Sequence, residues 1–328
     1  MKNNTYEKLL ISFKENGGFF HKSLKINKDP NKGFCIIATE DININEILID
    51  VPHNLLIPVD ETKSLTKFKN KFSEYFFQTL LEHDQYLKTH PFNSNSFELE
   101  KINISIKKNT NLAKNFSIRL NNFNSLNEEQ KKIELLASTR AIFIKKYKKN
   151  FFMPIMDFVN YHYDGLKYLT GNNGNIYIKS QEKIKKNQEI LISYTLSDAI
   201  SFFLKHGFID ESFRSFRIKK NELKLNLKSI STFNKNYFSK ENEVYTFKES
   251  IYFYGSSFSK NIFKFLEIFP PNQKVEMFKK ILNMYKNTID IDKKGDIDDN
   301  SIILKNFYKS ATLYKKIIDN CLNVFEKK

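Results

Sequence analysis

Polar and aromatic side chains that could do chemistry gather in two stretches of the chain. The first, MPIMDFVN at residues 153–160, ends in Asn160. An asparagine amide both donates and accepts hydrogen bonds, which suits a ligand with an ammonium and a carboxylate group. The second, EILISY at residues 189–194, is typical of a strand ending in Tyr194, and His206 follows it. A phenol can orient an amine, and an imidazole can act as a base near neutral pH. We treat the two stretches as one candidate site, provided that the fold brings them together.

Two further positions favour ligand binding, one through its charged side chain and the other because it has no side chain. Arg140 lies among small and apolar residues in ASTRAIF at residues 137–143. Its guanidinium can hold a carboxylate through two parallel hydrogen bonds. Gly33, in NKGF at residues 31–34, has no Cβ and allows close backbone approach to a ligand.

Each of these features also has an ordinary structural explanation. Gly33 fits a hairpin turn, and Arg140 fits the surface of an amphipathic helix. The segment 157–160 could be an Asx turn, and Tyr194 could be a core tyrosine at the end of a strand. The functional interpretation therefore depends on several motifs occurring together in the right order.

The order and separation of these motifs resemble SET-domain methyltransferases of the Rubisco large-subunit methyltransferase type. Residues 153–160 resemble that family's P-x-x-D-x-x-N-H signature, and residues 189–208 resemble its GEEI-x-I-x-Y … YGF ending. NKGF lies where the family has G-x-G-L, and YLKTHP at residues 86–91 is similar to its Y-L-x-x-L-P segment. The resemblance covers residues 17–60 and 136–212.

The resemblance implies an S-adenosylmethionine-dependent protein-lysine N-methyltransferase that releases S-adenosylhomocysteine and uses no metal. The residues expected to bind the cofactor are Lys32, Gly33, Phe34, Arg140, Asp157, Asn160, Tyr161 and Tyr194. Those expected to act in catalysis are Tyr194 and His206. The substrate cleft is expected to contain Tyr168 and His206.

Two residues depart from the family pattern inside its own motifs. Tyr161 stands where the family has histidine, and His206 stands where it often has tyrosine. His206 could hydrogen-bond the acceptor, act as a base, or cap the preceding helix. Two alternatives to lysine methylation follow: a protein-histidine N-methyltransferase, and a non-catalytic SET-like scaffold that binds a partner protein.

The fold class that we expect is α+β. A β-rich SET fold interrupted by a helical insert is followed by an all-α C-terminal domain. Residues 19–59 contain apolar runs and turn signals typical of strands, and residues 126–144 and 196–206 are typical of helices. The expected boundaries are 1–60 for the first part of the SET core, 61–135 for the insert, 136–212 for its second part, and 213–328 for the helical substrate-binding domain.

The net charge of +16 does not by itself define the partner of this protein. Such a charge favours an acidic or nucleic-acid-associated partner, but lysines spread along a chain rich in Lys, Asn, Ile and Phe also fit compositional drift. Direct binding of nucleic acid through the lysines stays open. The two cysteines and six histidines show no metal-ligand spacing. Without an apolar run as long as a membrane span, we expect a soluble cytoplasmic protein that does not enter the membrane.

Overall fold

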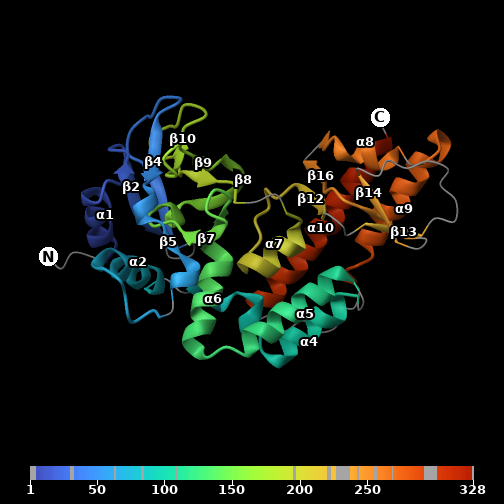
Figure 1. The fold of residues 1–328 in the computed structure, drawn as a ribbon, viewed down its shortest axis with the longest axis horizontal. Helices are drawn as coiled ribbons and strands as arrows, with labels where there is room; N and C mark the ends of the chain where they lie inside the picture. The colour runs from blue at the N-terminus through green and yellow to red at the C-terminus, as the bar shows by residue number, and fades with distance from the viewer. Residues whose placement is uncertain are drawn as a thin grey trace. The chain divides into compact units, whose positions relative to one another are not determined.

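The structure is a computed structural model that describes residues 5–29, 33–62, 64–82, 85–107, 110–194, 197–219, 223–226, 237–241, 244–254, 257–267, 269–291 and 301–326. The chain forms two compact units (Figure 1). The first contains Met1–Asn93, Leu120–Tyr194 and Lys205–Ser212. The second contains Ser94–Arg119, Thr195–Leu204 and Phe213–Lys328. The second unit thus includes part of the expected insert, and the domain boundaries given above stay a prediction.

Small sheets form the body of the first unit. Its strands are β1 (Phe19–Phe20), β2 (Leu24–Asp29), β3 (Gly33–Ala38), β4 (Ile47–Val51), β5 (Ile57–Pro58), β6 (Ile142–Ile144), β7 (Lys149–Phe152), β8 (Asn160–Leu166), β9 (Leu169–Thr170), β10 (Ile176–Lys179) and β11 (Leu191–Ile192). The sheets have the strand orders β1-β4-β10-β9, β2-β3, β5-β7-β6 and β11-β8. The strands predicted over residues 19–59 are confirmed, and β4 pairs with the distant β10 (Figure 1).

The helices of the first unit are α1 (Thr5–Glu15), α2 (Lys71–Leu81), α3 (Gln85–Lys88) and α6 (Glu128–Arg140), with short 3₁₀ turns η1 (His53–Leu55), η2 (Val59–Glu61), η3 (Pro91–Asn93) and η4 (Met156–Phe158). Two of these helices, α2 and α6, begin at asparagines whose side chains cap them. At α6 the side chain of Asn127 accepts the N–H of Gln130, whose side chain accepts the N–H of Asn127. This capping box satisfies two donors that a helix start otherwise leaves unpaired. Phe76 and Phe77 of α2 pack their rings against Phe152 of β7.

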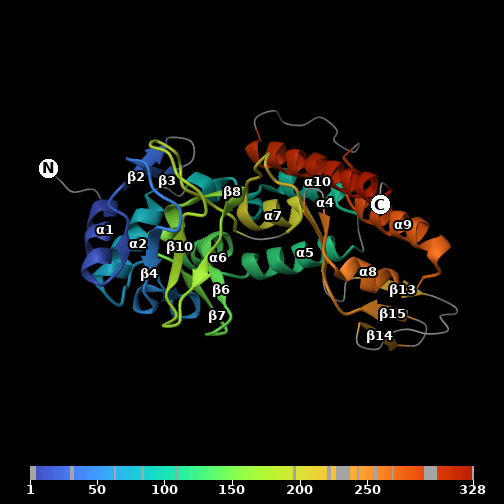
Figure 2. The same cartoon turned by 90° about the horizontal axis from the view of Figure 1, so that it is seen from above.

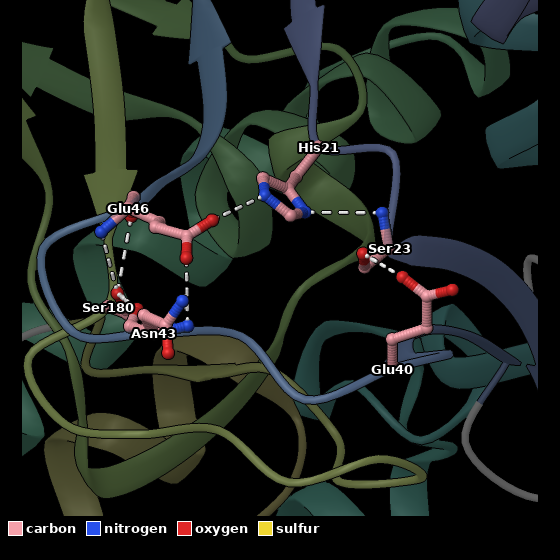
Figure 3. Close-up of polar contacts among 6 residues, drawn as sticks. All are labelled: His21, Ser23, Glu40, Asn43, Glu46 and Ser180. Atoms are coloured by element: carbon pink, nitrogen blue, oxygen red, sulfur yellow. Dashed lines mark hydrogen bonds and ion pairs between the residues drawn. The ribbon is translucent and has the colours of Figure 1, made fainter.

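A polar network joins the loop after β1 to the loops after β3 and β10 (Figure 3). Nδ1 of His21 accepts the N–H of Ser23 at 3.2 Å, so Nε2 carries the ring proton and donates to Glu46 at 2.9 Å. Glu46 also accepts the N–H of Asn43 at 3.0 Å and donates its own N–H to Ser180 Oγ at 3.0 Å. The Asn43 N–H and then His21 lower the pKa of Glu46. The network contributes stability above the usual glutamate range and loses it as the pH falls through this lowered pKa.

The second unit contains helices and two further sheets. Its elements are α4 (Ser96–Ser105), β12 (Ser215–Ile218), β13 (Lys224–Asn226), β14 (Phe238–Glu241), β15 (Val244–Phe247), β16 (Ile251–Tyr254), β17 (Ser257–Phe258), α8 (Asn261–Leu266), η5 (Pro271–Gln273), α9 (Lys274–Lys286) and α10 (Ile302–Glu326). The strand orders are β12-β16-β17 and β13-β15-β14. Helix α10 packs along α4 and α9 (Figure 2). Helices α5 (Asn111–Asn124) and α7 (Ala199–His206) contribute residues to both units.

Two expectations about secondary structure were wrong. The helix expected over residues 126–144 ends at Arg140, and Ile142–Ile144 form β6 because these residues pair with β7. The C-terminal part is not all-α, since residues 215–258 include β12 to β17. Runs such as VYTF and IYFY are rich in β-branched and aromatic residues, which fit a pleated, half-buried surface. The rest of residues 213–328 contains the helices α8, α9 and α10, in line with the helical character expected there.

Strands β8 and β11 pair in parallel, and a glycine makes their close approach possible. Leu191 pairs with Asn160 and Ile192 with Leu166, with an irregular register between them. A Cβ added to Gly165 would lie 2.6–2.8 Å from backbone atoms of Ile192. Because such a clash involves backbone, no side-chain rotation can relieve it.

We predict that Gly165→Ala lowers the free energy of unfolding by roughly 3 kcal/mol through this overpacking. Gly17→Ala is the matched control, because a Cβ there meets nothing within 4 Å and only the φ of +89° opposes it. The control should lose about 1 kcal/mol. Urea unfolding at constant pH measures both, and equal losses would contradict the close approach.

Candidate active site

The two motifs that the sequence singles out meet in the first unit. Nδ2 of Asn160, at the start of β8, donates to Glu189 Oε1 at 2.7 Å. The hydroxyl of Tyr194, two residues after β11, donates to the carbonyl of Val159 at 3.0 Å. The parallel pairing of β8 with β11 holds both contacts in register. Glu189 was not among the predicted site residues, although it lies inside the EILISY stretch.

Arg140 and Asp157 form the base of this region. Nη1 of Arg140, the last residue of α6, donates to the backbone carbonyl of Asp157 at 2.5 Å. Asp157 is 8% exposed, and its carboxylate accepts the N–H of Met153 at 3.3 Å. Burial raises the pKa of Asp157 to about 7, against the opposing effects of the Arg140 charge and of the Met153 N–H. A carboxyl that changes charge near neutral pH therefore lies beside the arginine.

The turn before Asp157 is strained. Ile155 is a buried β-branched residue with a φ of +68°, a region that L-residues other than Gly, Asn and Asp rarely occupy. Such a conformation costs about 1–3 kcal/mol and persists only where the surroundings enforce it. Here the carbonyl of Ile155 accepts the N–H of Phe158 at 3.0 Å. The surrounding structure therefore holds this strained turn, which leads into Asp157 and Asn160.

Three aromatic rings form a cluster with the phenol of Tyr194, which follows β11. The ring of Tyr194 lies 5.3 Å from that of Tyr161 and 5.6 Å from that of His206, measured between centroids. Phe208 closes the group, at 6.4 Å from Tyr161 and 6.2 Å from His206. Burial raises the pKa of Tyr161, so its phenol stays neutral. These ring contacts restrict the orientation of the Tyr194 ring, and its hydroxyl bonds to the carbonyl of Val159 instead.

His206 is held by a backbone carbonyl. It is 4% exposed, and its Nδ1 donates to the carbonyl of Thr139 at 3.0 Å. In the neutral ring the proton is therefore on Nδ1 and the lone pair on Nε2. The next residue, Gly207, has a φ of +77° and packs against the backbone of His90. A Cβ at this position would lie 2.9 Å from the Cα of His90, so a glycine is required there. His206 and Gly207 are thus both held in place by the backbone around them.

Three of the remaining predicted site residues, Tyr168, Phe34 and Gly33, lie within the described residues. Tyr168 is half-buried, and its pKa is raised by burial and by the charges of Tyr194 and Asp157, so it lies in the same neighbourhood. The ring of Phe34 lies 4.7 Å from that of Phe158, which brings the start of β3 to the Asp157 segment. Gly33 begins β3 with a φ of +79°. Lys32 lies outside the described residues.

No group of three metal-ligating side chains occurs within the described residues. The helices in the same ranges also lack the combined length and apolar character needed to cross a bilayer.

We predict that Asp157→Asn makes stability less dependent on pH. The pKa of Asp157 is raised from 3.8 to about 7 in the folded protein, so folding is opposed once the unfolded carboxyl ionises, and increasingly so until the pH passes the folded pKa. Between pH 5 and 8 the wild type should lose roughly 2–3 kcal/mol relative to the variant, from about 1.4 kcal/mol per pKa unit. Urea unfolding of both proteins at pH 5 and at pH 8 checks this. A constant difference between the two proteins would show that the carboxyl does not titrate in this range.

The SET-domain family model matches residues 33–195. A ribosomal lysine N-methyltransferase of Schizosaccharomyces pombe is 25% identical over 224 residues, which make up 60% of this chain and 58% of that protein. The matched part of the chain therefore spans less than two-thirds of this curated relative.

The fold is also similar to solved structures. The SET domain of LSMT bound to lysine and AdoHcy superposes with a TM-score of 0.57 at 14% identity, over 99% of this chain and 91% of that chain. Rubisco LSMT bound to AdoMet gives a TM-score of 0.55 at 14% identity, over 99% and 92%. The predicted SET fold is confirmed. From the family match and this shared fold, the chain contains a SET domain over residues 33–195 and has the fold of Rubisco LSMT.

Proposed function

We propose that this protein transfers a methyl group from S-adenosylmethionine to a lysine side chain of a protein substrate. The observation that carries the proposal is the joining of Asn160 and Tyr194 through the β8–β11 pair, with Arg140 beside them. The similarity to a ribosomal lysine N-methyltransferase and to LSMT structures holding AdoMet or lysine supports it.

The residues present fit this cofactor chemically. S-adenosylmethionine has a carboxylate, an ammonium group and an adenine edge. Arg140 supplies a guanidinium donor, and Glu189 beside Asn160 supplies a carboxylate for a cation. At Gly33 a Cβ would meet nothing within 4 Å, so space lies open in front of its backbone. We assign cofactor binding to these residues and to Phe34, Asp157 and Tyr161, and we keep Lys32 as a prediction from the sequence.

The cofactor supplies an electrophilic methyl group on a sulfonium, and the protein must present a neutral amine to it. A lysine amine has an ordinary pKa of about 10.4, so a proton leaves before attack. Burial among the rings of Tyr161, His206 and Phe208 disfavours the ammonium form. The Tyr194 hydroxyl donates its proton to Val159, so its oxygen presents lone pairs that can accept an amine N–H. Tyr194 thereby orients the acceptor nitrogen.

Other parts of the proposal concern substrate and location. We assign Tyr168 and His206 to the wall that receives the acceptor side chain. The net charge of +16 favours an acidic or nucleic-acid-associated substrate protein. A cytoplasmic location stays a prediction, which imaging of the tagged protein in its host would test.

We predict that S-adenosylhomocysteine raises the apparent melting temperature of the wild type. A ligand that binds only the folded state at about 100 times its Kd adds about 2.7 kcal/mol. Arg140→Met should remove most of this stabilisation, because the guanidinium that binds the carboxylate of the ligand is lost. Arg214→Met, which removes an exposed arginine from the second unit, is the control and should keep the full shift. No shift in the wild type at high excess would contradict cofactor binding.

We predict that Tyr194→Phe lowers kcat for methyl transfer about 100-fold, as expected for loss of a positioned hydroxyl, while the ring contacts and the thermal shift with S-adenosylhomocysteine persist. Tyr177→Phe removes a hydroxyl from β10 as a control and should stay near wild type. The assay uses labelled S-adenosylmethionine with host lysate, followed by mass spectrometry of the labelled residue.

Methyl-lysine in that assay is the expected product. Methyl-histidine would contradict the acceptor assignment. A Tyr194→Phe variant within about threefold of wild type would contradict the role of the phenol.

A further inference from the structure

The second unit contains a pocket of about 250 Å³ that is separate from the site described above. It is lined by residues of α5, the start of α7, the end of β12, and helices α9 and α10, which are labelled in Figure 1. Pockets that hold whole cofactors are usually larger, about 300–1,000 Å³. The size fits a single side chain or a small ion.

The charged side chains of the pocket are two cations and one anion. Arg217 and Lys219 come from the β12 segment, and Asp198 precedes α7. Counting two positive charges and one negative charge, the lining has a net charge of +1. The carboxylate of Asp198 is 7% exposed and accepts the N–H of Ser201 at 2.7 Å, so it serves the first turn of α7.

Arg217 is fixed on one side and lacks a partner on the other. It pairs with Tyr252 across β12 and β16, and its guanidinium carbon lies 5.1 Å from the centroid of that ring. Its Nε is buried and has no hydrogen-bond partner among the described residues. A buried donor without a partner costs about 1–3 kcal/mol. An anion in the pocket would remove that cost.

Tyrosine contacts hold the opposite wall in place. The hydroxyl of Tyr314 donates to the carbonyl of Tyr285 at 3.3 Å, and the hydroxyl of Thr288 donates to the same carbonyl at 2.7 Å. The ring of Phe216 lies 5.6 Å from Tyr285 and 5.8 Å from Tyr314. The wall is therefore formed before any ligand enters, which lowers the entropy lost on binding.

We propose that this pocket binds the carboxylate of an acidic side chain on a partner protein. A monoanion balances the net charge of +1, whereas a phosphate dianion would place a second negative charge near Asp198. The planar guanidinium fork of Arg217 matches carboxylate geometry, and the tyrosine rings can pack against the methylene groups of a glutamate. The identification of this partner with the methylated protein rests on the proposed function; the pocket chemistry does not.

The test uses the full-length protein and a fluorescein-labelled, acetylated peptide of alternating glycine and glutamate, followed by fluorescence anisotropy at low ionic strength. Arg217→Gln should weaken binding about tenfold, in line with the loss of charge-assisted hydrogen bonds. The affinity of Arg217→Lys should lie between those of the wild type and Arg217→Gln. Lys305→Gln removes an exposed charge of α10 that does not line the pocket, and it should stay within twofold of wild type. The same peptide with glutamine in place of glutamate should not bind.

Melting curves show whether Arg217→Gln is folded. If it is not, Lys219→Gln gives the test and should weaken binding about threefold. Equal weakening by the pocket variant and Lys305→Gln would overturn the proposal in favour of diffuse charge attraction. Displacement of the peptide by inorganic phosphate at lower concentration than by glutarate, at matched ionic strength, would overturn the carboxylate assignment. Because no cofactor is present, this result is independent of whether methyl transfer occurs.

Discussion

The parallel pairing of β8 with β11 is the constraint on which the candidate site depends. It brings together two segments that are about thirty residues apart in the sequence, and it requires backbone to pass where a side chain at position 165 would lie. Gly165 is therefore as necessary to the site as the residues that carry its polar groups. The two contacts that define the site, from Asn160 to Glu189 and from Tyr194 to Val159, both bridge this pair.

The site departs from what stability alone would favour. A buried carboxyl at Asp157 and a left-handed backbone at Ile155 both oppose folding. The surrounding structure compensates through the cap of α6, the ring contacts of Tyr194 and the carbonyl that holds His206. These costs concentrate in the segment to which we assign the cofactor, and residues held in strained or desolvated states are typical of functional sites.

The sequence was informative where local chemistry decides the structure. The apolar runs and turn signals over residues 19–59 predict the strands there, and the order of the motifs predicts the SET fold. It was uninformative where distant pairing decides. Whether Ile142–Ile144 extend a helix or form β6 depends on β7, and the strands after Phe213 depend on one another. The role of Glu189 becomes visible only when β11 lies beside β8, and the φ of Ile155 has no signal in its residue type.

Hydrogen–deuterium exchange with and without S-adenosylhomocysteine tests most directly whether the two motifs form one cofactor site. Backbone amides that become ordered around a bound ligand exchange more slowly. The structure predicts that residues 157–160 and 189–194 gain protection together, while β14 and β15 of the second unit stay unchanged. Protection confined to one of the two segments, or found in neither, would contradict the account.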